Sequence, residues 1–226
     1  MPRQSFQESL DELRENVLYM SELVADRLRR GLDALETKDA ALAEAVIEAD
    51  DEINELYLDL ESDCIDLFVL QQPVASDLRF VASSFKILTD LERIGDLATN
   101  LGKYTMGAAR DVVPEVDVRA IGDLALEMLN DAMVAYATRD PAACHDIAER
   151  DDDLDALCEQ ASNAIVRDLI ELEFGPGPDG TDVESLLEVA RRLLLTVRDL
   201  ERVGDHAVNI AARTLYVAQG SDELIY

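Results

Sequence analysis

Apolar side chains recur at steps of three and four residues along most of the chain. This spacing places them on one face of an α-helix. In the first such stretch the repeating positions are Leu10, Leu13, Val17, Met20, Val24, Leu28, Leu32 and Leu35. The pattern predicts an all-α fold with six helices, over residues 5–36, 40–71, 73–107, 118–138, 140–173 and 182–218. In the fifth helix, Asp140 is the expected N-cap and Pro141 the first helical residue.

The second half of the chain repeats the pattern of the first. Asp-Leu-Glu-Arg-Ile-Gly-Asp at residues 90–96 recurs as Asp-Leu-Glu-Arg-Val-Gly-Asp at 199–205, which is 109 residues later. Earlier in each half the offset is 101 residues, and the eight-residue difference falls in the Gly- and Pro-rich stretch at 174–180. Insertions are best tolerated in such loops. We therefore predict two tandem three-helix bundles related by pseudo-twofold symmetry.

The boundary between the two bundles is expected in the Pro-containing segment at residues 108–117. The first repeat would then occupy residues 1–110 and the second residues 115–226. Long helices with short connections pack antiparallel to their neighbours in the sequence.

The charge of the chain argues against some partners. The sequence has 49 Asp and Glu residues against 20 Lys and Arg residues, a net charge of −29. Direct binding to nucleic acid or to an anionic membrane surface is unfavourable for such a chain, because both need a basic surface. Asp outnumbers Glu, 28 to 21, and only three Lys occur. This composition is typical of a halophile, whose salt-rich cytoplasm screens the self-repulsion.

Other features favour a cytoplasmic protein. Neither a signal peptide nor an apolar run long enough to cross a membrane is recognised. The cysteines, Cys64, Cys144 and Cys158, are odd in number and form no Cys-x-x-Cys pair, which favours core positions in a reducing compartment.

Acidic residues lie one helical turn apart in each copy of the repeated block. Glu92 and Asp96 share one helix face, as do Glu201 and Asp205. The preceding helix offers Asp50 in the first repeat, and Asp151 with Asp155 in the second. If the middle and last helices pack side by side, these oxygens converge. An oxygen-rich site suits a hard divalent cation such as magnesium, manganese, calcium or iron, whereas zinc normally takes Cys or His ligands.

Two other interpretations of these acidic rows stay open. They are solvated side chains in a very acidic protein, or the repeated block has a structural role. In the structural interpretation Gly95 and Gly204 permit close helix contact, and Arg93 and Arg202 form ion pairs between the repeats. His206 follows Asp205 directly and points away from the row, so a ligand role is disfavoured.

Several enzyme classes lack their motifs here. A ferritin-like di-iron site needs Glu three residues before His, but Ala142 and Val203 stand before His145 and His206. No phosphate-binding loop and no nucleophile elbow is found. The residues alone leave a regulator, a metal-dependent enzyme or store, and a helical adaptor as candidates.

The duplicated block at this spacing resembles the PhoU family of phosphate-uptake regulators. The segment Gln72-Pro73-Val74-Ala75-Ser76-Asp77-Leu78-Arg79 also resembles the family's start of the third helix, whereas the second repeat has Leu186-Leu187-Glu188 in place of Asp-Leu-Arg. The resemblance implies a non-enzymatic regulator that lowers phosphate import. Its partners would be the ATPase subunit of the phosphate ABC transporter and, in bacteria, a sensor kinase. It also implies a homodimer, and iron, manganese, magnesium or zinc at the acidic rows.

Overall fold

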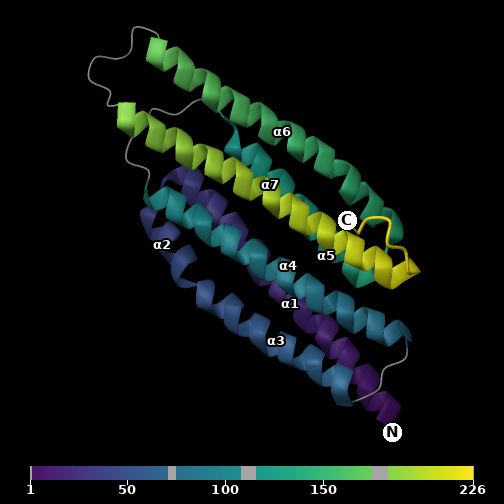
Figure 1. The fold of residues 1–226 in the computed structure, drawn as a ribbon. Coiled ribbons are helices and arrows are strands. Elements are labelled where there is room, and N and C mark those ends of the chain that lie inside the picture. The colour runs from purple at the N-terminus through teal and green to yellow at the C-terminus, as the bar shows by residue number, and fades with distance from the viewer. Residues whose placement is uncertain (1, 71–74, 108–115, 175–182, 226) are drawn as a thin grey trace.

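The structure is a computed structural model that describes residues 2–70, 75–107, 116–174 and 183–225. These residues form seven helices and no strand: α1 Pro2–Thr37, α2 Ala40–Glu48, α3 Asp50–Leu70, α4 Ala75–Met106, α5 Val118–Thr138, α6 Pro141–Phe174 and α7 Val183–Gln219. The predicted all-α fold of two tandem repeats is confirmed, and the helices run along a common direction (Figure 1). The predicted linker and the loop at 174–180 fall largely outside the described residues.

The same turn joins the first two helical segments of each repeat. Lys38 and Arg139 occupy equivalent positions and take left-handed backbone angles, with φ of 56° and 54°. The next residue caps the following helix: the Asp39 carboxylate accepts hydrogen bonds from the Ala41 and Leu42 N–H groups, and Asp140 does the same one repeat later. A left-handed residue followed by an Asp cap reverses the chain in very few residues.

The predicted second helix is wrong in one respect, because it is broken at Ala49 into α2 and α3. The Glu52 N–H donates to the Ala49 carbonyl three residues back, which tightens the helix locally. The break separates two places where the chain lies close to α4. A Cβ added at Gly102 would lie 3.0 Å from the Ala43 carbonyl oxygen, and one at Gly95 would lie 3.2 Å from Ile53 Cδ1. The equivalent helix of the second repeat, α6, is continuous as predicted.

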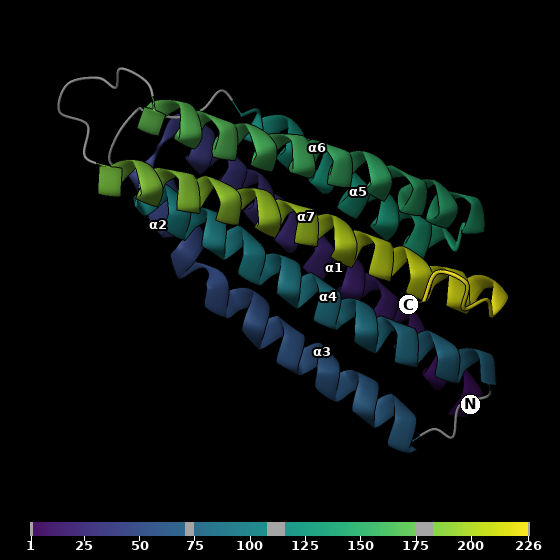
Figure 2. The same ribbon diagram turned by 45° about the horizontal axis from the view of Figure 1, so that its top comes forward.

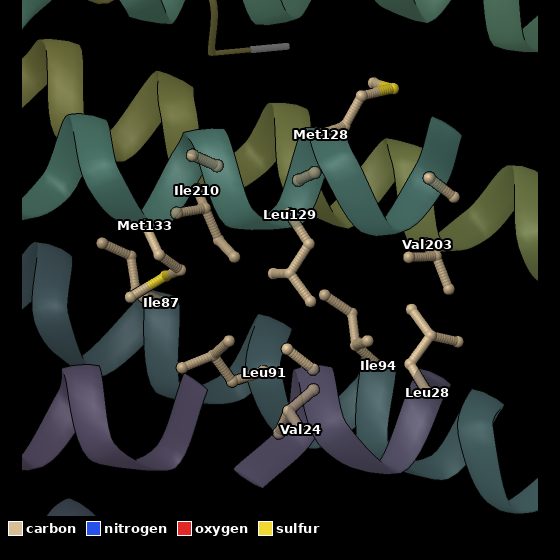
Figure 3. Close-up of a cluster of buried hydrophobic side chains, with 14 of the residues drawn as sticks. Val24, Leu28, Ile87, Leu91, Ile94, Met128, Leu129, Met133, Val203 and Ile210 are labelled. Atoms are coloured by element: carbon tan, nitrogen blue, oxygen red, sulfur yellow. The ribbon is translucent and has the colours of Figure 1, made fainter. Parts of the chain in front are cut away.

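The two repeats share one hydrophobic core. At its centre, buried side chains of α1 and α4 from the first repeat meet those of α5 and α7 from the second (Figure 3), and buried side chains of α3 and α6 extend the same cluster outward. The central members include Leu28, Leu91, Leu129 and Val203, all fully buried. The repeats are therefore joined by packing of α4 on α7 and of α1 on α5.

The remaining helices cover this core from outside. Helices α2 and α3 pack on α4, and α6 packs on α7, so that α3 and α6 form opposite outer edges of the molecule (Figure 2). A search of the described residues finds no helix that is both long and apolar enough to cross a membrane.

Candidate functional site

The structure places each predicted acidic row at the contact between an outer helix and a core helix. In the first repeat Asp50 begins α3, while Glu92 and Asp96 lie on α4. In the second repeat the outer helix is α6 and the core helix is α7. The side chains involved are Asp151, Asp155, Glu201 and Asp205.

The glycines of the repeated block let these helices approach one another, as the structural interpretation predicts. A Cβ added at Gly204 would lie 2.2 Å from Leu154 Cδ2 and 3.2 Å from an Asp151 oxygen. The equivalent pair in the first repeat, Gly95 with Ile53, is looser, at 3.2 Å. Because these close contacts lie beside the carboxylates, the block brings the outer helix and the acidic row together.

In the first repeat, groups of the protein itself compensate the carboxylates. Asp50 accepts hydrogen bonds from Thr99 Oγ1 at 2.8 Å and from Asn54 Nδ2 at 3.3 Å. The Arg27 guanidinium, only 5% exposed, is attracted by Asp50 and lies 3.4 Å from Glu52. Burial nevertheless lowers the pKa of Arg27.

Arg93 supplies a second cation to the first repeat, at 3.6 Å from Glu92 and 3.5 Å from Asp96. These ion pairs lie on α4 itself, so the expectation that Arg93 pairs across the repeat interface is wrong. Even so, the pKa of Glu92 is raised, mainly because the carboxyl is partly buried and also because Asp96 repels its charge.

In the second repeat, three of these compensating groups are replaced. Met128 stands in the position of Arg27, Val208 in that of Thr99, and Asp155 in that of Asn54. One cation and two polar partners are thereby lost, and one carboxylate is added. Burial and the neighbouring carboxylates raise the pKa of Asp151 to about 6, and they also raise the pKa values of Glu201 and Asp205. The structure thus brings all four predicted side chains close enough to repel one another.

One oxygen of this second cluster has no partner. The Asp151 Oδ1 atom is fully buried and accepts no hydrogen bond within the described residues. A buried carboxylate oxygen without a donor is costly, and a proton or a cation would satisfy it. In the described part of the chain, however, no three Asp, Glu, His or Cys side chains are arranged ready to hold a metal ion. Side-chain movement would be needed to complete such a site.

Sequence reasoning missed the role of the first residue of the repeated block. Asn100 Nδ2 donates to Asp199 at 3.1 Å, and Asn209 Nδ2 lies 3.4 Å from Asp90. Each Asp therefore contacts the Asn of the other repeat, and the two contacts are equivalent under the internal symmetry. The recurrence of both Asp and Asn at the same offset of 109 residues was the signal.

The two reciprocal contacts have diverged in their surroundings. Asp199 is fully buried and also accepts from Tyr104 Oη at 2.8 Å and from the Arg198 guanidinium at 2.6 Å. Asp90 instead faces His206, whose Nδ1 lies 2.9 Å away. His206 therefore serves the contact between the repeats, a role that the sequence analysis did not predict.

A cavity of about 280 Å³ lies elsewhere, between the ends of α1, α4, α5 and α7. It is lined largely by apolar side chains such as Leu32, Val189 and Leu193. Its Arg119 is held by three carboxylates, of Asp33, Glu36 and Asp123, at 2.7–2.9 Å. Lys38 and Arg192 also line the cavity.

The chain consists of a duplicated helical unit, and the two copies share one core and each carry a carboxylate face. These features define a class of two-repeat helical proteins. The PhoU domain model matches the chain twice, at residues 17–105 and 118–214. The predicted resemblance is confirmed, and the chain belongs to the PhoU family.

Similar proteins match over nearly the whole chain. A "phosphate-specific transport system accessory protein PhoU homolog" of Pseudomonas putida is 32% identical over 97% of this chain and 82% of its own length. The protein of the same description from Clostridium acetobutylicum is 31% identical over 97% of both chains. The crystal structure of PhoU from Pseudomonas aeruginosa superposes with a TM-score of 0.86, at 30% identity over 96% of this chain and all of that one.

Proposed function

We propose that this protein regulates phosphate uptake, lowering import by a phosphate-specific ABC transporter when phosphate is plentiful. One observation carries the proposal: both repeats match the PhoU domain, and the relatives named as phosphate transport accessory proteins align over 97% of the chain. The alternative of a metal-dependent enzyme or store is not favoured by these relatives. A regulator needs surfaces for partners and no substrate chemistry.

Direct contact with the ATPase subunit of the transporter is the proposed mechanism. In bacteria a sensor kinase would be a further partner. The protein would act in the cytoplasm, where the ATPase subunit is accessible, and as a homodimer. Sedimentation of the purified chain in high KCl measures the oligomeric state, and titration with purified ATPase subunit measures the contact.

The decisive experiment measures uptake of radiolabelled phosphate in a strain from which the gene has been deleted. Uptake in phosphate-rich medium should rise several-fold and return to normal when the gene is restored. Unchanged uptake in the deletion strain would contradict the proposed function.

We further propose that the second repeat binds a divalent cation as part of this function. The orphaned Asp151 oxygen and the raised pKa of Asp151 support this, because a cation would remove both the repulsion and the missing contact. The ligands would be Asp151, Asp155, Glu201 and Asp205, and the all-carboxylate set suits iron, manganese or magnesium better than zinc. The cation would tie α6 to α7. Arg93 has a counterpart in Arg202, but Arg27, which supplies positive charge near Asp50, is replaced by Met128 in the second repeat.

Thermal unfolding in the presence of Mn²⁺ or Fe²⁺ tests this part of the proposal. Bound metal should raise Tm by mass action in the wild type. The rise should disappear in Glu201→Gln/Asp205→Asn and persist in the matched control Glu92→Gln/Asp96→Asn. A rise that is equal in all three proteins, or absent from all, would remove these residues from the site.

A further inference from the structure

Helix α3 carries a second apolar face that points away from the core. Its core-facing residues include Ile53, Leu60 and Cys64, all nearly fully buried. The opposite face bears Leu58, Ile65 and Val69, which are 59%, 50% and 70% exposed. Steps of seven and four residues place these three side chains in one row along the helix. We call them the outer stripe of α3.

No helix among the described residues covers the outer stripe. Among the described helices α3 packs on α1, α2 and α4, and its buried side chains, Ile53, Leu60, Cys64 and Leu67, lie on the face away from the stripe. Both views of the ribbon place α3 at the edge of the molecule (Figures 1 and 2). Single exposed apolar residues are ordinary, but an aligned row of three on one helix is the pattern of a docking surface.

The second repeat retains the distal part of this row. Val166 and Ile170 of α6 stand at the positions of Ile65 and Val69, and they are 46% and 52% exposed. The position of Leu58 is taken by Glu159. The row in α6 therefore has two apolar members instead of three, and a charged side chain stands at the position of the third.

The charge around the outer stripe selects the kind of partner. Helix α3 has eight Asp and Glu residues among its 21 and no Lys or Arg. Burial and the nearby Glu12, Asp59 and Asp66 raise the pKa of Asp63, which shows how crowded these acids are. A second copy of this chain docked through the same face would bring two such acidic helices together, which like-charge repulsion opposes.

From this geometry we propose that the outer stripe of α3 is the docking surface for an apolar helix of another protein that is flanked by Lys and Arg. The apolar side chains of that helix cover Leu58, Ile65 and Val69, and its cations meet the acids on either side of the stripe. This is the packing of two amphipathic helices through their apolar faces, with charge complementarity at the edges. It deepens the proposed regulatory function, on which it rests for the assignment of the partner to the phosphate-uptake system.

The physical test uses a labelled 18-residue peptide with a Leu face between two rows of Lys, and a scrambled peptide of the same composition. Binding to the full chain is measured by fluorescence anisotropy in 1 M KCl, where the Debye length is about 3 Å and non-specific attraction is small. The amphipathic peptide should bind, and Ile65→Ser/Val69→Ser should weaken it about tenfold, as expected for residues at the centre of an interface. Leu58→Ser provides an independent variant on the same stripe.

Two control variants locate the effect. Val134 is 60% exposed on α5, outside the stripe, so Val134→Ser should leave the affinity unchanged. Val166→Ser/Ile170→Ser should change it by less than about threefold, since the row in α6 is short. The proposal would be overturned if the scrambled peptide bound as tightly as the amphipathic peptide. It would also be overturned if the stripe variants bound the amphipathic peptide as tightly as the wild type does. So would a wild-type dimer that the stripe variants dissociate, because the occupant would then be a second copy.

The uptake assay separates this proposal from the regulatory function. If the deletion strain regains normal uptake with the wild-type gene but not with Ile65→Ser/Val69→Ser, both are supported. Normal uptake with that variant would overturn the docking surface and leave the regulatory function standing. Uptake that does not respond to deletion removes the regulatory function, while the peptide result still decides whether the surface binds a basic amphipathic helix.

Discussion

The two acidic faces occupy equivalent places in one fold but differ in how far the protein itself compensates their charge. In the first repeat Asp50 has two hydrogen-bond donors and attracts Arg27, a cation that the second repeat lacks. In the second repeat Asp151 faces further carboxylates, and one of its buried oxygens has no partner. The same helix contact is thus compensated by the protein in one half and left for a proton or a cation in the other.

The difference shows how a duplicated site diverges without loss of the fold. The glycine, the acidic pair and the Asp–Asn contacts recur in both halves, while the groups around them have changed. A cation-dependent second repeat would respond to its surroundings, whereas the first repeat holds its outer helix without help. The following experiments test this contrast.

The largest effect is expected from salt. Lowering KCl from 2 M to 0.05 M lengthens the Debye length several-fold and strengthens the repulsion among the carboxylates behind the net charge of −29. We expect Tm to fall by roughly 10 °C, equivalent to several kcal/mol in a chain of this size. As KCl is lowered, amide hydrogen exchange should show that α6 loses protection at a higher salt concentration than α3 does. Equal Tm at both concentrations would contradict the halophile interpretation, and simultaneous loss in α3 and α6 would weaken the contrast between the repeats.

The second-largest effect is expected from removing the Asp side chains that join the two repeats. Asp199→Ala removes a fully buried acceptor and leaves the half-buried Asn100 and Tyr104 without it, so it should cost about 2–3 kcal/mol of unfolding free energy. Asp90→Ala removes a less enclosed contact to His206 and Asn209, and should cost about 1 kcal/mol. Urea unfolding measures both. Equal costs would mean that the two reciprocal contacts have not diverged in energy.

The two glycines of the repeated block should respond differently to alanine. At Gly204 the new methyl group would overlap fully buried Leu154, so Gly204→Ala should destabilise by about 1–2 kcal/mol after the gain in helix propensity. At Gly95 the contact with Ile53 is tighter than usual but not overlapping. Gly95→Ala should therefore change stability by less than about 0.5 kcal/mol. Thermal unfolding of the two single variants, at fixed salt and without metal, provides the comparison.

The smallest effects are expected from replacing Asp151 or Asp50 by Asn, which should change the stability of the protein in opposite directions. The folded-state pKa of Asp151 is raised from 3.8 to about 6, so between these pH values the folded chain binds a proton that the unfolded chain does not. Stability should therefore fall as pH rises through this window. Asp151→Asn should remove that dependence and stabilise the protein by about 1 kcal/mol at pH 8, a value reduced for partial exposure.

The matched variant in the first repeat is Asp50→Asn. It removes a carboxylate that accepts from Thr99 and attracts Arg27, so it should destabilise by about 0.5–1 kcal/mol at pH 8. Unfolding curves without metal at pH 5 and pH 8 test both variants. Changes of the same sign would show that the two faces are electrostatically alike.

The fold was largely predictable because its information is local and repeated. The spacing of apolar residues predicts six helices that cover all seven of the described ones, and the duplicated block predicts the internal symmetry. The break at Ala49 was not predictable, because it depends on how closely α2 and α3 approach α4, which is a property of tertiary packing. The site was predicted only in part. The carboxylates follow from the spacing of Glu and Asp, but the effect of Arg27 on Asp50 requires knowing that α1 lies beside α3.

The contacts between Asp90 and Asn209 and between Asp199 and Asn100 illustrate the same limit. Each pair joins residues about a hundred positions apart, and nothing in the local sequence distinguishes a side chain that faces the other repeat from one that faces solvent. Only the pairing of α4 with α7 in three dimensions reveals it. The internal repeat indicated that the block mattered without showing which of its residues crosses the interface.

The shared core has a consequence for how such a chain arose. Each repeat contains both an Asp and an Asn of the reciprocal contacts, so two identical copies of one repeat carry everything needed to pair with each other. An ancestral chain of half this length would have assembled as a symmetric dimer in which these contacts joined two molecules. Fusion of two such copies would make the contacts intramolecular and let each copy change independently. The presence of Arg27 in one repeat and Met128 at the same place in the other is the kind of difference that a symmetric dimer of identical chains could not carry.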